Sequence, residues 1–324
     1  TIGEMYMQNI SERIRQTLLQ EYGFEICGIH KITTGVGGDA FLINAHQGRF
    51  IYKIVDANEM NPPEEEPEIC NFLFRRGLEV SNFLKNKSGN FVTPFDGKRV
   101  SHVQKYVEGK AFAMNAAPDW FMLQSPLLLG RIHNELHKYK ELPMGIGDEF
   151  FRYMTPENAK NSYHHSYELA KQRGETDILN DLEFRLKIVE KIRDWKFDLQ
   201  KLTYCNSHGD YTVNQIICGE DKINAVIDWT CACRHPVIWE ITRSFFYAEP
   251  SCMDGQYDEV KFKDYVEHYC SVAPLTQYDR TNLIKLYLYQ LAVCDYYSQY
   301  LADIHKREEY LLQAQFATKV LQNI

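Results

Sequence analysis

Two aspartates, Asp210 and Asp228, flank a short predicted hairpin. Its strands are the apolar runs 215–218 and 223–227, which a polar, glycine-containing turn separates. Paired strands lie about 5 Å apart, so the residues before the first strand return towards the residue that follows the second. Either aspartate alone is also typical of a turn or a strand end. Together, two neighbouring anions are unfavourable unless a cation or a proton lies between them. The pattern therefore predicts one metal-binding carboxylate and one general base.

The composition bounds the class of protein. The chain has 324 residues, 44% hydrophobic and 13% aromatic, enough for a packed core in one large domain or two moderate ones. No apolar run approaches the roughly 18 residues of a membrane-spanning helix, and residues 1–16 lack a signal peptide's apolar core. Nine scattered cysteines, an odd number, favour a reduced, cytoplasmic protein. A net charge of −8 argues against nucleic acid as the main partner.

The hydrophobic periodicity changes at about residue 108. Before it, strands are predicted within 25–56 and at 99–107, and helices at 5–22 and 61–77. After it the pattern is mostly helical, at 118–140, 147–172, 176–196, 236–248, 258–271 and 280–322. We therefore expect an α+β fold with a small strand-rich lobe at 1–107. A larger helical lobe at 108–324 would contain the hairpin, and a cleft would separate the two.

The segment HGDYTVNQII…VIDWT resembles the aminoglycoside phosphotransferase and choline kinase family, small-molecule kinases with a protein-kinase-like fold. The shared pattern is His-Gly-Asp-x-x-x-x-Asn followed by a hydrophobic residue, aspartate, and tryptophan or phenylalanine. HGDY and the later HPVIWEITRSF are most similar to bacterial spore-coat kinase-like proteins. The resemblance implies an antiparallel-sheet N-terminal lobe with one main helix, and a helical C-terminal lobe. It also implies an ATP- and Mg²⁺-dependent phosphotransferase that acts on a hydroxyl of a small metabolite or an aminoglycoside-like compound.

The resemblance assigns roles to the residues around the hairpin. Asp210 would be the catalytic base, Asp228 the Mg²⁺ ligand, and His208 a brace of the loop backbone. The family asparagine that supplies a second metal ligand is Gln215 in this chain, and Asn214 lies one position earlier. Either Gln215 reaches the ion, or Asn214 replaces it through a shifted register, or the metal site is impaired. The last possibility would make the protein a nucleotide-binding pseudokinase or a structural protein of the spore-coat type.

The N-terminal lobe would hold the nucleotide. In RFIYKIV, Lys53 lies on one strand face between two apolar neighbours, and the resemblance makes it the lysine that contacts the ATP phosphates. Glu68, on the following helix, is predicted as its ion-pair partner. The preceding glutamates, at 64–66, are predicted to face solvent near the positive end of that helix.

Two further segments are predicted to contact ATP. Glycines between two strands allow backbone amides to approach phosphates, and this loop contains Gly35, Gly37 and Gly38. The end of the strand at 99–107 would offer backbone groups to adenine, from Gln104, Tyr106 and Val107.

The acceptor is less constrained by the sequence. Acidic residues between 249 and 267 would suit a cationic small molecule, although such a run is also typical of a solvated helix face. The HNELH segment at 133–137 lacks the glutamate directly after its first histidine that a zinc protease needs, so we expect His133 to pack. Glu240 is predicted to brace the catalytic loop and to pair with Arg243.

Overall fold

The computed structural model describes residues 2–32, 39–56, 61–302 and 307–324. The chain divides into two compact units, which we call the sheet unit (Thr1–Lys110 with Gln215–Ala232) and the helical unit (Ala111–Asn214 with Cys233–Ile324). The first boundary, at 110, is close to the predicted one at 107. The prediction differs from the structure in one respect, because it placed the hairpin in the helical lobe.

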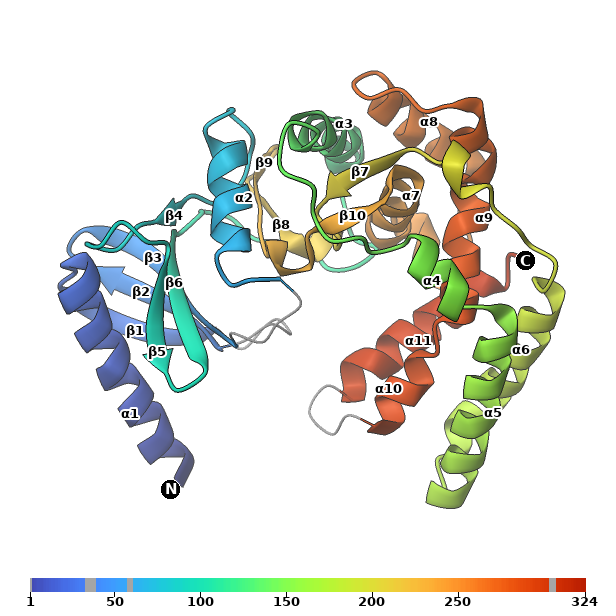
Figure 1. Ribbon diagram of the computed structural model, residues 1–324, viewed down its shortest axis with the longest axis horizontal. Coiled ribbons are helices and arrows are strands. Elements are labelled where there is room, and N and C mark those ends of the chain that lie inside the picture. The colour runs from blue at the N-terminus through green and yellow to red at the C-terminus, as the bar shows by residue number, and fades with distance from the viewer. Residues whose placement is uncertain (1, 33–38, 57–60, 303–306) are drawn as a thin grey trace. The chain divides into compact units, whose positions relative to one another are not determined.

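The sheet unit contains a six-stranded antiparallel sheet of order β1-β2-β3-β6-β4, with β5 also pairing with β6 (Figure 1). The strands are β1 (Ile26–Ile32), β2 (Asp39–Ala45), β3 (Gly48–Asp56), β4 (Phe83–Leu84), β5 (Val92–Asp96) and β6 (Arg99–Lys105). The predicted strands within 25–56 and at 99–107 are confirmed. The short β4 and β5 were not predicted; β4 has two residues, and β5 contains a proline, which weakens a strand signal.

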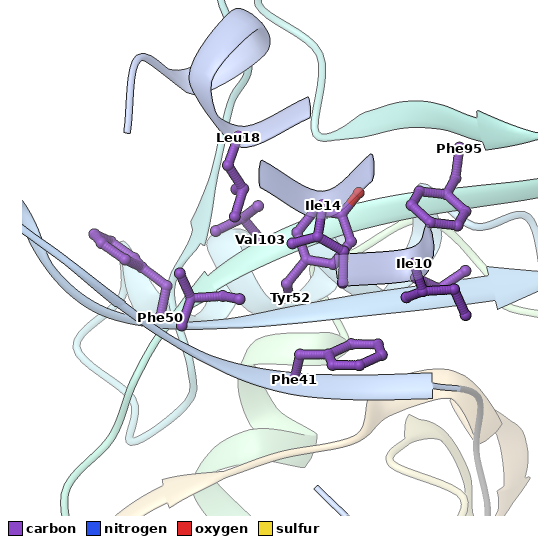
Figure 2. Close-up of a cluster of buried hydrophobic side chains, with 10 residues drawn as sticks. Ile10, Ile14, Leu18, Phe41, Phe50, Tyr52, Phe95 and Val103 are labelled. Atoms are coloured by element: carbon purple, nitrogen blue, oxygen red, sulfur yellow. The ribbon is translucent and has the colours of Figure 1, made fainter. Parts of the chain in front are cut away.

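Helix α1 (Ile2–Thr17) packs its apolar stripe on one face of this sheet, and a short π-helix (Leu18–Tyr22) continues it. Ile10, Ile14 and Leu18 recur every four residues and are at most 5% exposed. They meet inward-facing side chains of the strands, among them Phe41, Phe50, Tyr52 and Val103 (Figure 2). Because Phe50 and Tyr52 face this core, the alternate residues of β3 point to the opposite face.

Helix α2 (Glu65–Phe74) and the hairpin β8 (Ile216–Cys218)–β9 (Ile223–Val226) complete the sheet unit. Val226 N donates to Glu79 O at 2.8 Å, and Lys110 N donates to Cys218 O at 3.1 Å. These backbone bonds tie both hairpin strands to the first part of the chain. Gly109 permits the second contact, since a Cβ there would lie 2.2 Å from Cys218 O.

The helical unit is built from helices around a second, two-stranded antiparallel sheet, β7 (Tyr204–Ser207) with β10 (Cys233–Pro236). The helices are α3 (Asp119–Leu136), α4 (Asp148–Tyr153), α5 (Pro156–Arg173), α6 (Leu179–Lys191), α7 (Val237–Ala248), α8 (Glu259–Cys270), α9 (Gln277–Val293), α10 (Tyr296–Ala302) and α11 (Arg307–Leu321). The predicted helical regions are confirmed, with 147–172 and 280–322 divided into shorter helices. No helix in the described part of the chain is both long and apolar enough to cross a bilayer.

Candidate active site

Lys53 is a buried charge at the centre of the sheet unit. It lies on β3, on the face opposite α1, and is 6% exposed. Its Nζ donates to Asp228 Oδ1 at 2.8 Å and to Glu66 Oε2 at 3.5 Å. The structure therefore brings together two of the predicted site residues, the strand lysine and the aspartate that follows the hairpin.

The helix carboxylate beside Lys53 is Glu66, and the prediction of Glu68 is corrected. Glu66 is buried and Glu68 is exposed. Two positions along an α-helix turn the side chain by about 200°, so these glutamates face opposite ways. The expectation that Glu65 and Glu66 face solvent is also wrong, because both are buried in the first turn of α2.

Glu66 has two further partners that the sequence analysis missed. His102 Nε2 of β6 lies 3.4 Å from Glu66 Oε2, and Trp229 N donates to Glu66 Oε1 at 3.1 Å. Burial favours a raised pKa for Glu66, but Lys53, His102 and the Trp229 amide outweigh it and lower the pKa to about 2. His102 lies at a buried position of β6, and a histidine at such a position of a predicted strand is the signal that could have identified it.

Asp228 follows β9 in a left-handed conformation with φ 61° and ψ 67°, which aspartate tolerates better than most residues. Its carboxylate accepts from Lys53 and from Thr230 Oγ1 at 3.1 Å, and its side chain is 27% exposed. Ile227 N donates to Gln215 O at 2.9 Å, so the hairpin places Gln215 across from the residue before Asp228. Asn214 is exposed and belongs to the helical unit.

The donors at the hairpin suit a hard cation. Asp228 offers carboxylate oxygens, and the neighbouring Gln215 offers an amide oxygen, the ligand types that Mg²⁺ prefers. Among the described residues no group of three or more His, Cys, Asp or Glu side chains could hold a metal.

In the helical unit, β7 leads into the loop that carries Asp210. His208 is fully buried, and Asp210 N donates to its Nδ1 at 3.1 Å. Gly209, between them, has φ 81°, a conformation open to glycine. His208 therefore contacts the loop backbone, in agreement with the brace predicted for it.

The Asp210 carboxylate is paired with Arg243 of α7. Arg243 Nη1 donates to Asp210 Oδ1 at 2.5 Å, and the side chains are 14% and 28% exposed. The prediction that Glu240 pairs with Arg243 is therefore wrong. No local pattern signals this contact, because Asp210 and Arg243 are 33 positions apart.

Glu240 is a buried anion beneath the loop. It accepts hydrogen bonds from Ser207 Oγ and from Tyr211 N, the latter at 3.2 Å, so it contacts the loop on both sides of Asp210. His133 Nε2 and His235 Nε2 each lie 3.5 Å from Glu240 Oε2. Burial opposes the charged form, but the two histidines hold the pKa of Glu240 well below its usual range. Burial likewise lowers the pKa of His235, yet Cys233 and Glu240 raise it to about 10.

The predicted nucleotide segments are described only in part. Gly35, Gly37 and Gly38 lie outside the described residues. Gln104 pairs with Ile51 and Phe83 within the sheet. Tyr106 N donates to Arg49 O at 3.1 Å, and the Arg49 guanidinium lies 3.9 Å from the Tyr106 ring centre. Of the three residues predicted to contact adenine, Gln104 pairs within the sheet and Tyr106 bonds to Arg49, and Val107 follows both.

Several acidic residues at 249–267 have partners within the helical unit. Glu249 is 2% exposed and accepts from Lys261 Nζ at 2.6 Å. Asp258 caps α8 by accepting from Val260 N at 2.8 Å. His133, in the HNELH segment, is buried and bonded to Tyr269 Oη at 2.8 Å, so the expectation that it packs is confirmed.

Comparisons with known proteins identify the family and the fold of the chain. Residues 28–275 match the phosphotransferase enzyme family. A homoserine kinase of Methylobacillus flagellatus is 19% identical over 254 residues, 78% of this chain and 73% of its own length. Among solved structures, a spectinomycin phosphotransferase with ADP and spectinomycin has a TM-score of 0.65 at 13% identity, covering 96% of each chain.

Two further structures share the fold. An amicoumacin kinase in complex with AMP-PNP, Ca²⁺ and its antibiotic has a TM-score of 0.64 at 12% identity, over 98% of this chain and 96% of its own. The choline kinase LicA of Streptococcus pneumoniae has a TM-score of 0.58 at 14% identity, over 98% of this chain and all of its own (100%). The predicted α+β, protein-kinase-like fold is confirmed. The chain belongs to the phosphotransferase enzyme family.

Proposed function

We propose that the protein transfers the terminal phosphoryl group of ATP to a hydroxyl of a small metabolite, with Mg²⁺ bound at Asp228. The observation that carries the proposal is the position of Lys53, a buried ammonium held between Glu66 and Asp228. A lysine on the strand, its helix glutamate and a metal-binding aspartate are the parts that position ATP phosphates in kinases. We assign these three roles to Lys53, Glu66 and Asp228, in that order.

In the sheet unit, Lys53 would contact the phosphates while Glu66 keeps it in place. Glu66 can do so because His102 and the Trp229 amide also contact its carboxylate, which leaves the ammonium able to exchange Asp228 for a phosphate. Asp228 and Gln215 would hold Mg²⁺, which when bound neutralises phosphate charge. Backbone groups at Val107 would meet adenine.

In the helical unit, Asp210 would orient the acceptor hydroxyl and accept its proton. Its side chain is 28% exposed, so it can meet a substrate, and the buried His208 and Glu240 fix the loop on which it stands. Proton acceptance by a positioned carboxylate is worth roughly 10²–10⁴ in rate.

We propose an acceptor that is small and not strongly cationic. Two of the acidic residues considered for a cationic pocket are engaged elsewhere, Glu249 with Lys261 and Glu267 with Arg280 at 2.5 Å. The charge nearest to Asp210 is the cation of Arg243. A polycationic aminoglycoside needs several unengaged carboxylates, so amino alcohols and hydroxy amino acids are better candidates.

The second candidate function is nucleotide binding without turnover. Gln215 favours it, because its amide stands on a stem one bond longer than that of the family asparagine, and Mg²⁺ requires near-ideal octahedral geometry. A Mg²⁺-dependent rise in melting temperature with ATP is expected for both candidates, and only the kinase would consume ATP with an acceptor.

The deciding experiment measures ATP consumption with homoserine, choline and spectinomycin, for the wild-type protein and for Asp210→Asn. We expect turnover with a small amino alcohol or hydroxy amino acid, and a fall of about 10²–10⁴ in kcat for the variant. The affinity for Mg²⁺-ATP should change less than about twofold, because Asp210 is not assigned to phosphate binding. Equal turnover by the variant would remove Asp210 from the mechanism.

A further inference from the structure

Arg243 is an ion-pair partner of Asp210 that is itself rigidly held. It lies on α7 with Trp239 four positions before it and Tyr247 four positions after it. Its guanidinium lies 5.4 Å from the Trp239 ring centre and 4.7 Å from that of Tyr247. Residues four apart share one face of a helix, so the two rings flank the cation. Arg243 therefore has few alternative rotamers, and its direction is set by α7.

This geometry fixes a direction for the Asp210 carboxylate. An aspartate on a loop turns about two side-chain bonds, and a backbone brace such as His208 does not restrict them. The bond from Arg243 Nη1 to Asp210 Oδ1, at 2.5 Å, does restrict them. Charge-assisted bonds from a planar guanidinium are among the strongest and most directional contacts of a carboxylate.

The same helix also holds the backbone of the loop. Glu240 lies three positions before Arg243, on the same side of α7, and accepts from Tyr211 N and Ser207 Oγ. Helix α7 thus contacts the loop before Asp210, after Asp210, and at the Asp210 carboxylate itself. Glu240 aligns the main chain, and Arg243 aligns the reacting side chain.

We infer that Arg243 is a positioning residue for phosphoryl transfer: it holds the Asp210 carboxylate in the direction in which Asp210 meets the acceptor hydroxyl. The inference rests on the proposed role of Asp210. In the transfer, the hydroxyl oxygen bonds to the terminal phosphorus as the bond to the ADP oxygen breaks. The hydroxyl proton passes to Asp210, and Arg243 keeps its protons throughout.

The test compares Arg243→Gln, which removes the charge at similar size, with Arg243→Lys, which keeps it. The control is Arg280→Gln, which breaks the ion pair between Arg280 of α9 and Glu267 of α8 in the same unit. Turnover is measured with ATP and the best of homoserine, choline and spectinomycin, together with ATP hydrolysis without acceptor. Dissociation constants for Mg²⁺-ATP and melting temperatures are measured on the same samples.

We expect Arg243→Gln to lower kcat by about 10–100-fold, because small misplacements of a reacting group reduce rates on that scale. KM for ATP and the Mg²⁺-ATP dissociation constant should change less than about twofold. Arg243→Lys should recover part of kcat, and Arg280→Gln should leave kcat within about twofold. A purely structural role would instead give equal melting losses and equal kcat for the Gln and Lys variants, and that result would overturn the inference.

A crystal structure of Arg243→Gln provides a readout that does not require turnover. We expect the Asp210 carboxylate to turn away from its wild-type direction while the 207–211 backbone stays in place. An unmoved carboxylate would overturn the inference even if kcat fell. If Asp210→Asn keeps wild-type turnover, the proposed role of Asp210 fails, while a turned carboxylate in Arg243→Gln still shows that Arg243 positions it.

Discussion

At the scale of residues, the carboxylates of Glu66 and Asp228 share one ammonium, that of Lys53, in the sheet unit. Lys53 is closer to Asp228 than to Glu66, 2.8 Å against 3.5 Å, and Glu66 has additional partners in His102 and the Trp229 amide. Asp228 is also the more exposed of the two acids, at 27% against 5%. The exposed contact is the one that incoming phosphates and Mg²⁺ would replace, and the buried contact is the one that keeps the lysine in place.

Replacing Lys53 tests this distribution of charge. Lys53→Met keeps the length of the side chain and leaves Glu66 and Asp228 without their ammonium. Removing one partner of a buried ion pair costs about 3–5 kcal/mol of unfolding free energy. Lys31→Met is the matched control, because Lys31 pairs with Asp39 on a neighbouring strand but is 38% exposed, and such pairs contribute about 0–1 kcal/mol. Urea unfolding measures both; equal losses would contradict the buried role of Lys53.

Glu66 gives a prediction for acid stability. Its pKa is about 2 in the folded protein and 4.5 as a free side chain, so its ionised form stabilises the fold at all pH values above 4.5. That contribution is lost as the pH falls from 4.5 towards 2. Glu66→Gln should therefore destabilise the protein at pH 7 by about 1–3 kcal/mol and show a shallower decline in acid. Glu68→Gln, on the exposed side of α2, is the control and should retain the wild-type profile in a melting series.

At the scale of elements, periodicity predicted most helices and the long strands because each buries one regular face. It failed where an element is short or where a face is chosen by distant partners. Strands β7 and β10 have four residues each and are separated by the residues 208–232, so neither carries a local signal. Three consecutive glutamates, 64–66, stand at the N-cap and the first two positions of α2, and partners from other elements decide that Glu66 points inwards. For the same reason, the sequence predicted Glu240 as the partner of Arg243, whereas the partner is Asp210.

The hairpin element carries its own prediction, on which amide serves the metal. Gln215 directly precedes β8, and its carbonyl accepts from Ile227 N, next to Asp228, whereas Asn214 is exposed and belongs to the other unit. Gln215→Ala should weaken Mg²⁺-dependent ATP binding by about 10–100-fold, the usual effect of losing a group that supports a metal site. Gln215→Asn should retain binding, and Asn214→Ala should leave it unchanged. Titration of Mg²⁺ at fixed ATP measures the three; a larger loss for Asn214→Ala would reassign the ligand.

At the scale of the whole molecule, the chain passes between its two units at 110–111, 214–215 and 232–233. Lys53, Glu66 and Asp228 belong to the sheet unit, and Asp210 and Arg243 belong to the helical unit. The family motif in the sequence predicted Asp210 and Asp228 as a pair, but it did not show that a unit boundary falls between them. Phosphate binding and hydroxyl activation are thus assigned to different units of one chain. Lys110, the last residue before the first crossing, is also hydrogen-bonded to Cys218 of the hairpin.

The backbone conformation of Gly109 therefore bears on nucleotide binding, because the hairpin next to it leads to Asp228. It has φ 124°, and a Cβ there would lie 2.2 Å from Cys218 O, so Gly109→Ala must displace β8, the hairpin strand that pairs with the strand leading to Asp228. Gly174→Ala is the matched control, because its φ is also positive, at 73°, but nothing lies within 4 Å of the added Cβ. The control should lose about 1 kcal/mol from backbone strain, and Gly109→Ala should lose more. Only Gly109→Ala should lose the Mg²⁺-ATP-dependent rise in melting temperature, since it alone moves the hairpin that carries the metal ligand; an unchanged rise would show that the hairpin's attachment does not govern nucleotide binding.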